Sequence, residues 1–141
     1  MKANKLVFVY WNVTRKCWSI RSMSFPDKGI VIGYARNLRL KNCTFKVSEA
    51  GRQRVLKTGR KGVHAGIIGE MIYCDPGDGS PAMVEREVLL FMDDVKEDAR
   101  AARYNPKELT HFVDTQTGAS LDTANHVWLG LNRSVHYGGT R

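Results

Sequence analysis

The first half of the chain alternates between apolar and polar positions with a period of two, which is typical of β-strands. Over residues 5–11 both faces of the expected strand are apolar, which predicts a central place in a sheet. A polar turn and a second alternating segment follow within 12–23, so the pattern predicts a β-hairpin. The alternation continues through 30–34 and 38–47. Together these segments predict a four- or five-stranded antiparallel meander over residues 5–47.

A short helix is predicted after this meander. Ser48 is a good N-cap residue, because its hydroxyl can accept a hydrogen bond from a free amide of the first turn. Residues 50–57 then form about two turns, and Gly59 stands where a left-handed C-cap is expected. The apolar pattern over 63–73 returns to that of a strand.

The segment 83–103 is the strongest helix candidate in the second half. Its apolar residues recur at spacings of three and four, and Arg100 and Arg103 at its end suit the helix dipole. The alternative is a strand over 87–92 followed by a short helix. A loop is predicted before this segment, at 75–81, where glycine and proline are frequent.

The C-terminal part predicts shorter elements. Tyr104-Asn105-Pro106 ends the preceding element, since the residue before proline avoids the helical region. Strands are expected over 110–114 and 127–131, with Thr117-Gly118 in the turn between them. The fold class expected is therefore α+β: one antiparallel, β-rich domain over 1–141 with one or two helices.

The composition favours a cytoplasmic protein with reduced thiols. No apolar run approaches the roughly 20 residues that span a bilayer, and no signal-peptide pattern is found at the N-terminus. Cys17, Cys43 and Cys74 are odd in number and far apart, so neither a disulfide framework nor a zinc site is expected. We expect no membrane association and no cofactor.

Positive charge is concentrated in the N-terminal part of the chain. The net formal charge is +8, but residues 1–61 carry 15 Lys and Arg against two acids, a balance of +13, whereas 62–141 carry a balance of −5. Such asymmetry predicts a positive face that attracts anions.

The basic charge is densest over 46–64, which points to phosphate binding. This segment holds one acid, Glu49, and three glycines that allow backbone amides to approach a ligand. Arginine forks suit phosphate oxygens, although neither a Walker loop nor a dinucleotide fingerprint is present. The cations of the segment are Lys46, Arg52, Arg54, Lys57, Arg60 and Lys61.

Catalytic patterns are weak, so a binding protein is expected rather than an enzyme. The four histidines lack metal-ligand spacing, and no serine lies in a nucleophile elbow. Aromatic side chains offer stacking surfaces for bases instead, although most of them are expected in the core and one or two on the surface. The candidates are Phe8, Tyr10, Trp11, Trp18, Tyr34, Tyr104, Phe112, Trp128 and Tyr137.

Two stretches resemble a family of small proteins of tailed bacteriophages. The first is E-A-G-R-Q-R-V-L-x-x-x-R-K-x-V-H-A over 49–65, which follows a hairpin of the form V-F-V-Y-W-N-V-T-R-K-C-W-S-I-R over 7–21. The second is Y-N-P-x-x-x-x-x-F-V-D-x-x-T-G-A over 104–119. In size and basic character the chain is also similar to the anti-Thoeris sponges of phages, which hold cyclic ADP-ribose-type immune signals without cleaving them.

The resemblance implies an anti-defence protein in the cytoplasm of an infected bacterium. It implies a β-rich homo-oligomer that sequesters a phosphorylated signal, either of the cyclic ADP-ribose type or a cyclic oligonucleotide. By chemistry and motif position, the candidate ligand-binding residues are Arg52, Arg54, Arg60, Lys61, His64, Tyr104 and Asn105. One alternative is a basic protein that binds nucleic acid or inhibits an acidic host defence protein. The second is a small nucleotide hydrolase.

Overall fold

The described chain forms one antiparallel sheet and one helix. The computed structural model describes residues 5–59, 63–75, 83–84, 99–130 and 133–138. The strand order is β3-β2-β1-β5-β4-β10-β11-β7-β8-β9, and β6 pairs with β5 beside this path. The elements are β1 (Leu6–Asn12), β2 (Cys17–Ser22), β3 (Val31–Ala35), β4 (Asn37–Val47), α1 (Glu49–Thr58), β5 (Ala65–Asp75), β6 (Met83–Val84), β7 (Arg100–Arg103), β8 (Phe112–Asp114), β9 (Ser120–Leu121), β10 (Thr123–Leu129) and β11 (Val135–Gly138).

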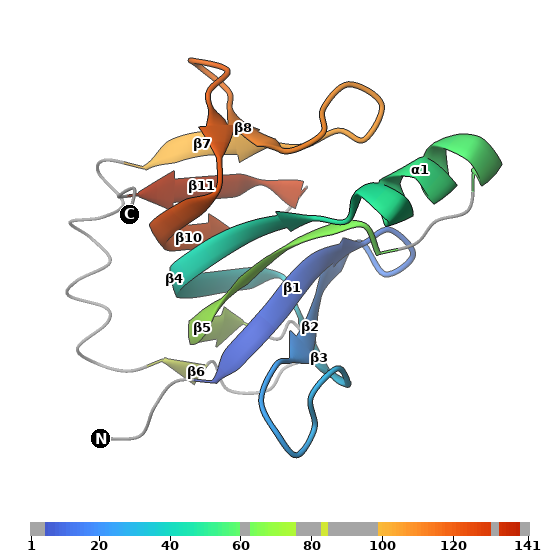
Figure 1. Ribbon diagram of the computed structural model, residues 1–141. Coiled ribbons are helices and arrows are strands. Elements are labelled where there is room, and N and C mark those ends of the chain that lie inside the picture. Colours follow the sequence, from blue (N-terminus) through green and yellow to red (C-terminus); the bar gives the residue numbers. More distant parts are fainter. Residues whose placement is uncertain (1–4, 60–62, 76–82, 85–98, 131–132, 139–141) are drawn as a thin grey trace.

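The sheet is strongly curved (Figure 1). The indole Nε1 of Trp18, on β2, donates a 2.8 Å hydrogen bond to the carbonyl oxygen of Gly130, just after β10. Three strands, β1, β5 and β4, separate β2 from β10 in the sheet. The sheet must therefore curl to bring Trp18 and Gly130 together, and its inner face becomes the core.

The inner face is defined by alternate residues along each strand. Val7 and Val9 of β1 are fully buried, whereas Phe8 and Tyr10 between them are only half-buried. Burial of these inner side chains is the main source of stability. The largest fully buried apolar side chains include those of Leu38, Leu40, Ile67, Leu129, Val7, Val9 and Val127.

The predicted first hairpin is confirmed. β1 and β2 pair in register from Val7↔Ser22 to Asn12↔Cys17. The Asn12 side chain accepts a hydrogen bond from the backbone amide of Arg15, and the turn ends at Lys16 with a positive φ of 54°. β1 also pairs with β5, so the strand with two apolar faces is indeed internal.

The predicted meander over residues 5–47 is wrong at its last connection. β1, β2 and β3 are consecutive in the sheet, but β4 pairs with β5 and β10 and lies apart from β3. α1 reverses the chain so that β5 returns alongside β4, starting from the pair Val47↔Ala65. β5 thereby occupies the place between β1 and β4.

β4 contains a bulge that could not be predicted from the alternation of apolar and polar residues in the sequence. Leu38 and Leu40 are buried, and so are Cys43 and Phe45. In a regular strand, residues 40 and 43 would face opposite sides of the sheet, because successive side chains alternate. The register with β5 shifts between Lys41 and Thr44, and Asn42 has a positive φ of 52°. The extra residue keeps both apolar pairs on the inner face.

The helix prediction after the first strands is confirmed, including both caps. The Ser48 hydroxyl accepts a hydrogen bond from the amide of Gly51, and Gly59 adopts φ 69° in the left-handed region. Ser48 also donates its own backbone amide to the carbonyl of His64, at 2.6 Å. The start of α1 is therefore fastened to the segment that enters β5.

The predicted helix over 83–103 is wrong at both of its described ends. Residues 83–84 form β6 and Arg100–Arg103 forms β7, while 85–98 lie outside the described residues. Ala102 is buried opposite Val135 of β11, so tertiary pairing overrides the helical spacing. Of the loop predicted over 75–81, Asp75 belongs to β5 and the remainder lies outside the described residues.

The C-terminal strands are confirmed, but their connection is not. The turn at Thr117-Gly118 joins β8 to the short strand β9, not to the strand containing Val127. β10 instead pairs with β4 and β11. The strand expected over 127–131 begins earlier, at Thr123.

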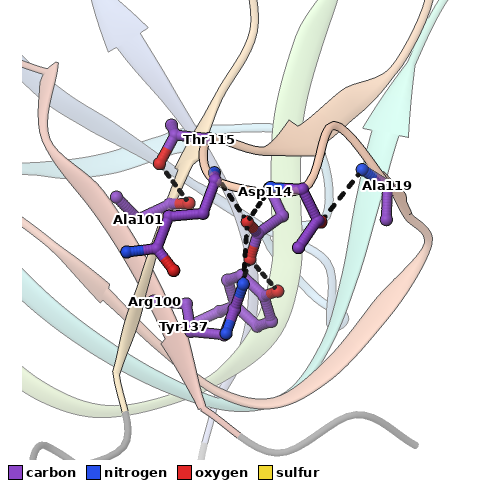
Figure 2. A network of polar contacts seen from close by, with 8 residues as sticks. Arg100, Ala101, Asp114, Thr115, Ala119 and Tyr137 are labelled. Carbon is purple, nitrogen blue, oxygen red and sulfur yellow. Dashed lines mark hydrogen bonds and ion pairs between the residues drawn. The ribbon is translucent and has the colours of Figure 1, made fainter.

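A buried carboxylate links three of these strands (Figure 2). Asp114 of β8 is 1 % exposed and accepts hydrogen bonds from Arg100 of β7 and from the Tyr137 hydroxyl of β11, at 2.5 and 2.6 Å. The backbone amides of Gln116 and Thr117 also donate to it, at 2.8 and 3.0 Å. The Arg100 guanidinium, followed by the Tyr137 hydroxyl, holds the pKa of Asp114 well below its usual value.

This network predicts a loss of stability in acid. A carboxyl whose folded pKa is lowered contributes its full stabilisation above its unfolded pKa, near 3.8, and loses it progressively as the pH falls further. Asp114→Asn should therefore be less stable than the wild type at neutral pH, and the difference should shrink below about pH 3.8. Urea unfolding across pH measures this. The exposed Asp122→Asn is the control, and an equal deficit in both variants would contradict the prediction.

The indole hydrogen bond that accompanies the curl of the sheet gives a second prediction. Trp18 and Trp128 are similarly buried, at 4 % and 6 % exposed, but the Trp128 Nε1 has no hydrogen-bond partner among the described residues. Trp18→Phe should therefore cost about 1–3 kcal/mol more than Trp128→Phe, since only the first leaves a carbonyl unsatisfied. Urea unfolding of both variants tests this, and equal losses would show that the Trp18 bond contributes nothing.

Candidate functional site

A cavity among the described residues lies at the end of the core beside α1, which contributes Val55 to its wall. Its volume is about 530 Å³, within the range of small-ligand sites. Its walls come from the first hairpin, α1, the start of β5, the end of β7, β8 and β11. The lining residues are Tyr10, Trp11, Asn12, Val13, Thr14, Trp18, Val55, Val63, His64, Ala65, Gly66, Ile67, Ala102, Arg103, Tyr104, Pro106, Phe112, Arg133 and Val135.

Two groups of rings line this pocket. Trp11 and Trp18 are directly opposite on β1 and β2, and their rings meet edge to face with centroids 5.2 Å apart. Tyr104 lies between His64 and Phe112, at centroid distances of 5.6 and 5.2 Å. Of these rings, those of Trp11 and Tyr104 are half-buried and offer flat apolar surfaces of the kind on which a base can stack, whereas Trp18 and Phe112 are buried.

Tyr104 also carries an unsatisfied polar atom. Its hydroxyl is buried and has no hydrogen-bond partner among the described residues. Burial raises the pKa of Tyr104, and the nearby positive charge of Arg52 opposes this effect. The hydroxyl is therefore protonated at neutral pH and available to donate. Because a buried donor without a partner is costly, it marks a place where a ligand acceptor would be stabilising.

Positive charge reaches the pocket from Arg103 and Arg133. Both side chains are exposed, and Arg103 forms an ion pair with Glu108 at 3.2 Å. Arg133 has a positive φ of 62°, an uncommon conformation for a residue other than glycine. No acid occurs among the lining residues that the structure describes. The pocket therefore combines rings with two cations, which suits an anionic aromatic ligand.

Apart from Arg52, the residues predicted from the sequence divide into three groups. His64 and Tyr104 line the pocket, as their motif positions indicate. Arg54 is exposed on α1 and Asn105 lies in the turn after β7, where its side chain accepts a hydrogen bond from the amide of Lys107; neither lines the pocket. The other two, Arg60 and Lys61, lie outside the described residues.

Arg52 does not line the pocket but positions α1 beside it. Its Nε donates to the carbonyl oxygen of Pro106 at 2.9 Å, and its Nη1 lies 2.8 Å from a carboxylate oxygen of Glu49. Arg52 thus ties α1 to the turn that follows Tyr104. On the same helix, a Cβ at Gly51 would lie 3.1 Å from the Cβ of His64, so this glycine allows α1 to approach the pocket wall closely.

Two lining residues could not be found from the sequence. Arg103 was expected at the end of a helix, and Arg133 was not singled out at all. They are 30 positions apart and reach one pocket only because β7 and β11 are paired strands. No local motif signals such a pairing.

Among the described residues, no group of three or more His, Cys, Asp or Glu side chains could hold a metal ion. In the same part of the chain, no helix has the length and apolar character needed to cross a bilayer. Cys17, Cys43 and Cys74 all lie within the described ranges, and no disulfide joins them there.

The fold and pocket define a small antiparallel β-protein with a basic, aromatic cavity. The family model of the Mycobacterium phage L5 gene 82 protein matches residues 1–137, and the chain belongs to this family. The gene 82 protein of Mycobacterium phage L5 is 33 % identical over 129 residues, which cover 87 % of this chain and 88 % of that protein. The expected relation to small bacteriophage proteins is thereby confirmed. No solved structure matches the chain.

The unsatisfied hydroxyl in the pocket predicts a contrast between two tyrosines. Tyr104→Phe removes a group without a described partner, so the free energy of unfolding should stay unchanged or rise. Tyr137→Phe removes a donor to the Asp114 carboxylate and should cost about 1.5–3 kcal/mol. Denaturant unfolding of both variants without ligand measures the contrast. A comparable loss in Tyr104→Phe would mean that its hydroxyl is already satisfied.

Proposed function

We propose that this phage protein binds and sequesters a phosphorylated, nucleotide-type immune signal of its host and leaves the molecule intact. The ligand class is a cyclic ADP-ribose-type molecule or a cyclic oligonucleotide. The main support is one observation: aromatic side chains and two arginines line a single pocket, and one of these aromatic residues, Tyr104, has a buried hydroxyl without a partner among the described residues. The site of action is the cytoplasm of the infected bacterium. The homo-oligomer expected from the resemblance stays a prediction.

Each part of the proposed ligand has a matching group in the pocket. A base stacks on the Trp11–Trp18 pair or on the ring of Tyr104, and the Tyr104 hydroxyl donates to an acceptor on the base or sugar. Arg103 and Arg133 contact phosphate oxygens, for which guanidinium forks are well suited. Glu108 already accepts from Arg103, so Arg133 is the cation more readily available to a ligand.

Capture without cleavage follows from the chemistry of these groups. Arginine stays protonated near neutral pH and cannot act as a general base. His64 is the histidine among the described lining residues, and its backbone carbonyl accepts a hydrogen bond from the Ser48 amide. If the protein did turn its ligand over, His64 would be the first candidate for the base.

The decisive experiment is capture followed by release. The protein is incubated with a panel of cyclic nucleotides and with lysate from cells in which the host signal is active. It is then separated from free ligand and heated, and the released molecules are identified by mass spectrometry. We expect one nucleotide to be recovered with unchanged mass, in a constant molar ratio to protein. Excess ligand converted to a new mass would show an enzyme, and failure to retain any nucleotide would refute the proposal.

Variants tie the captured ligand to the pocket. Arg133→Ala and Tyr104→Phe should each weaken binding about 10-fold, as expected for the loss of one ligand hydrogen bond. Arg54→Ala removes the same charge from an exposed helix position outside the pocket and should change affinity less than about 2-fold. Calorimetry on all three, with melting temperatures matched, separates pocket contacts from the general effect of charge.

A further inference from the structure

A second concave surface lies on the outer face of the sheet. It has a volume of about 430 Å³. Phe8, Arg21 and Ile68 meet here because Phe8 is directly opposite Arg21 on β2 and opposite Ile68 on β5. Lys46 and Ser48, at the end of β4 and the start of α1, form another wall. Val63 and His64 border both cavities.

Aromatic rings and cations alternate across the three strands that lead away from this groove. The rings of Phe8 and Tyr10 are 6.0 Å apart and tilted by 33°. The Arg21 guanidinium lies over the Tyr10 ring at 5.2 Å, and that of Arg15 lies over the Tyr34 ring at 4.1 Å. Tyr10 and Tyr34 occupy one register row, separated by the small residue Ser19.

The groove is shaped by a missing side chain. A Cβ at Gly66 would lie 2.6 Å from the ring of Phe8 and 2.5 Å from the carbonyl oxygen of Val9. The absence of a side chain therefore lets the Phe8 ring lie over the backbone of β5. This leaves a shallow depression between Phe8 and Lys46, which is directly opposite Gly66 on β4.

The charge on this surface is almost entirely positive. Within the described part of the chain, Arg15, Arg21 and Lys46 form no ion pair with an acid. The Arg21 Nε is buried there without a hydrogen-bond partner. The nearest acid in the register, Glu70, accepts a hydrogen bond from Asn42. The uncompensated cations are complementary to a polyanion.

We propose that this surface binds single-stranded nucleic acid. The outer strip is defined as Phe8, Tyr10, Arg15, Arg21, Tyr34 and Lys46. The Phe8 ring and the guanidinium planes that cover the Tyr10 and Tyr34 rings stack on unpaired bases of any sequence. The cations contact the phosphates of a nucleic-acid strand that runs across the sheet from β3 towards Lys46 on β4. A duplex presents no free base faces to such a surface, so the strip selects single strands. The strip shares Tyr10 with the wall of the pocket, and its groove adjoins the pocket at Val63 and His64. The proposal does not depend on the function of the pocket.

The test is fluorescence polarisation with a short labelled oligothymidylate and its duplex, over a range of salt concentrations. Arg21→Gln with Lys46→Gln should weaken single-strand binding at least about 10-fold and reduce the salt slope by about 0.7 for each phosphate that the variant no longer neutralises. Phe8→Leu, which keeps an apolar side chain but removes the ring, should weaken it at least about 5-fold. The single strand should bind more tightly than the duplex.

Two controls make the outcome specific. Lys28→Gln removes a cation from the β2–β3 loop, outside the strip, and Tyr104→Phe alters only the pocket; both should bind the oligonucleotide as the wild type does. Melting temperatures establish that each variant is folded. Unchanged affinity in the folded double variant, or an equal loss in Lys28→Gln, would overturn the proposal. Loss in Tyr104→Phe alone would place the strand in the pocket and overturn it as well.

Discussion

The hydrogen bond from the Trp18 indole to the Gly130 carbonyl marks the constraint on which the structure depends. One long sheet must curl until β2 meets the end of β10. A flat sheet of this length would expose its inner face to water on one side. Curling encloses that face without a second layer, because distant strands of one sheet then face each other across the core. The same curl brings Trp18 and Arg133 to the wall of one pocket, so core formation and site formation are one event.

The Asp114 network fixes another part of the same inner face. Arg100, Ala102 and Tyr104 lie on alternate positions of β7 and the residue after it, so they share one side of the strand. Arg100 is held by Asp114, Ala102 packs in the core, and Tyr104 reaches the pocket. A strand anchored by an ion pair at one end positions a ring at the other. The stability network and the candidate site are therefore joined through a few residues of rigid backbone.

Local features of the fold were predictable from the sequence, and non-local ones were not. The first hairpin and the capped helix depend on neighbouring residues, such as Ser48 and Gly59, whose conformational preferences act over a few positions. The insertion of β5 between β1 and β4 depends on pairing across the chain, which no short pattern encodes. The helix prediction over 83–103 was wrong at Arg100–Arg103 for the same reason. This four-residue segment with two alanines fits the period of a helix as well as that of a strand, so its pairing partners decide its structure. In the site, His64 and Tyr104 were found by motif, whereas Arg133 became visible only through the paired strands.

The basic segment 46–64 shows why charge density in a sequence is a poor guide to a single site. Its residues pass from the end of a strand through a helix to the start of another strand, and each element turns its side chains in a different direction. Lys46 lies on the outer face, Arg52 ties the helix to the turn after β7, Arg54 faces solvent and His64 borders both cavities. Period-two alternation separates neighbours in the same way, sending Phe8 outward and Val9 inward. The fold therefore separates the residues of one basic stretch: Lys46 borders the outer groove, His64 borders both cavities, and Arg52 and Arg54 line neither.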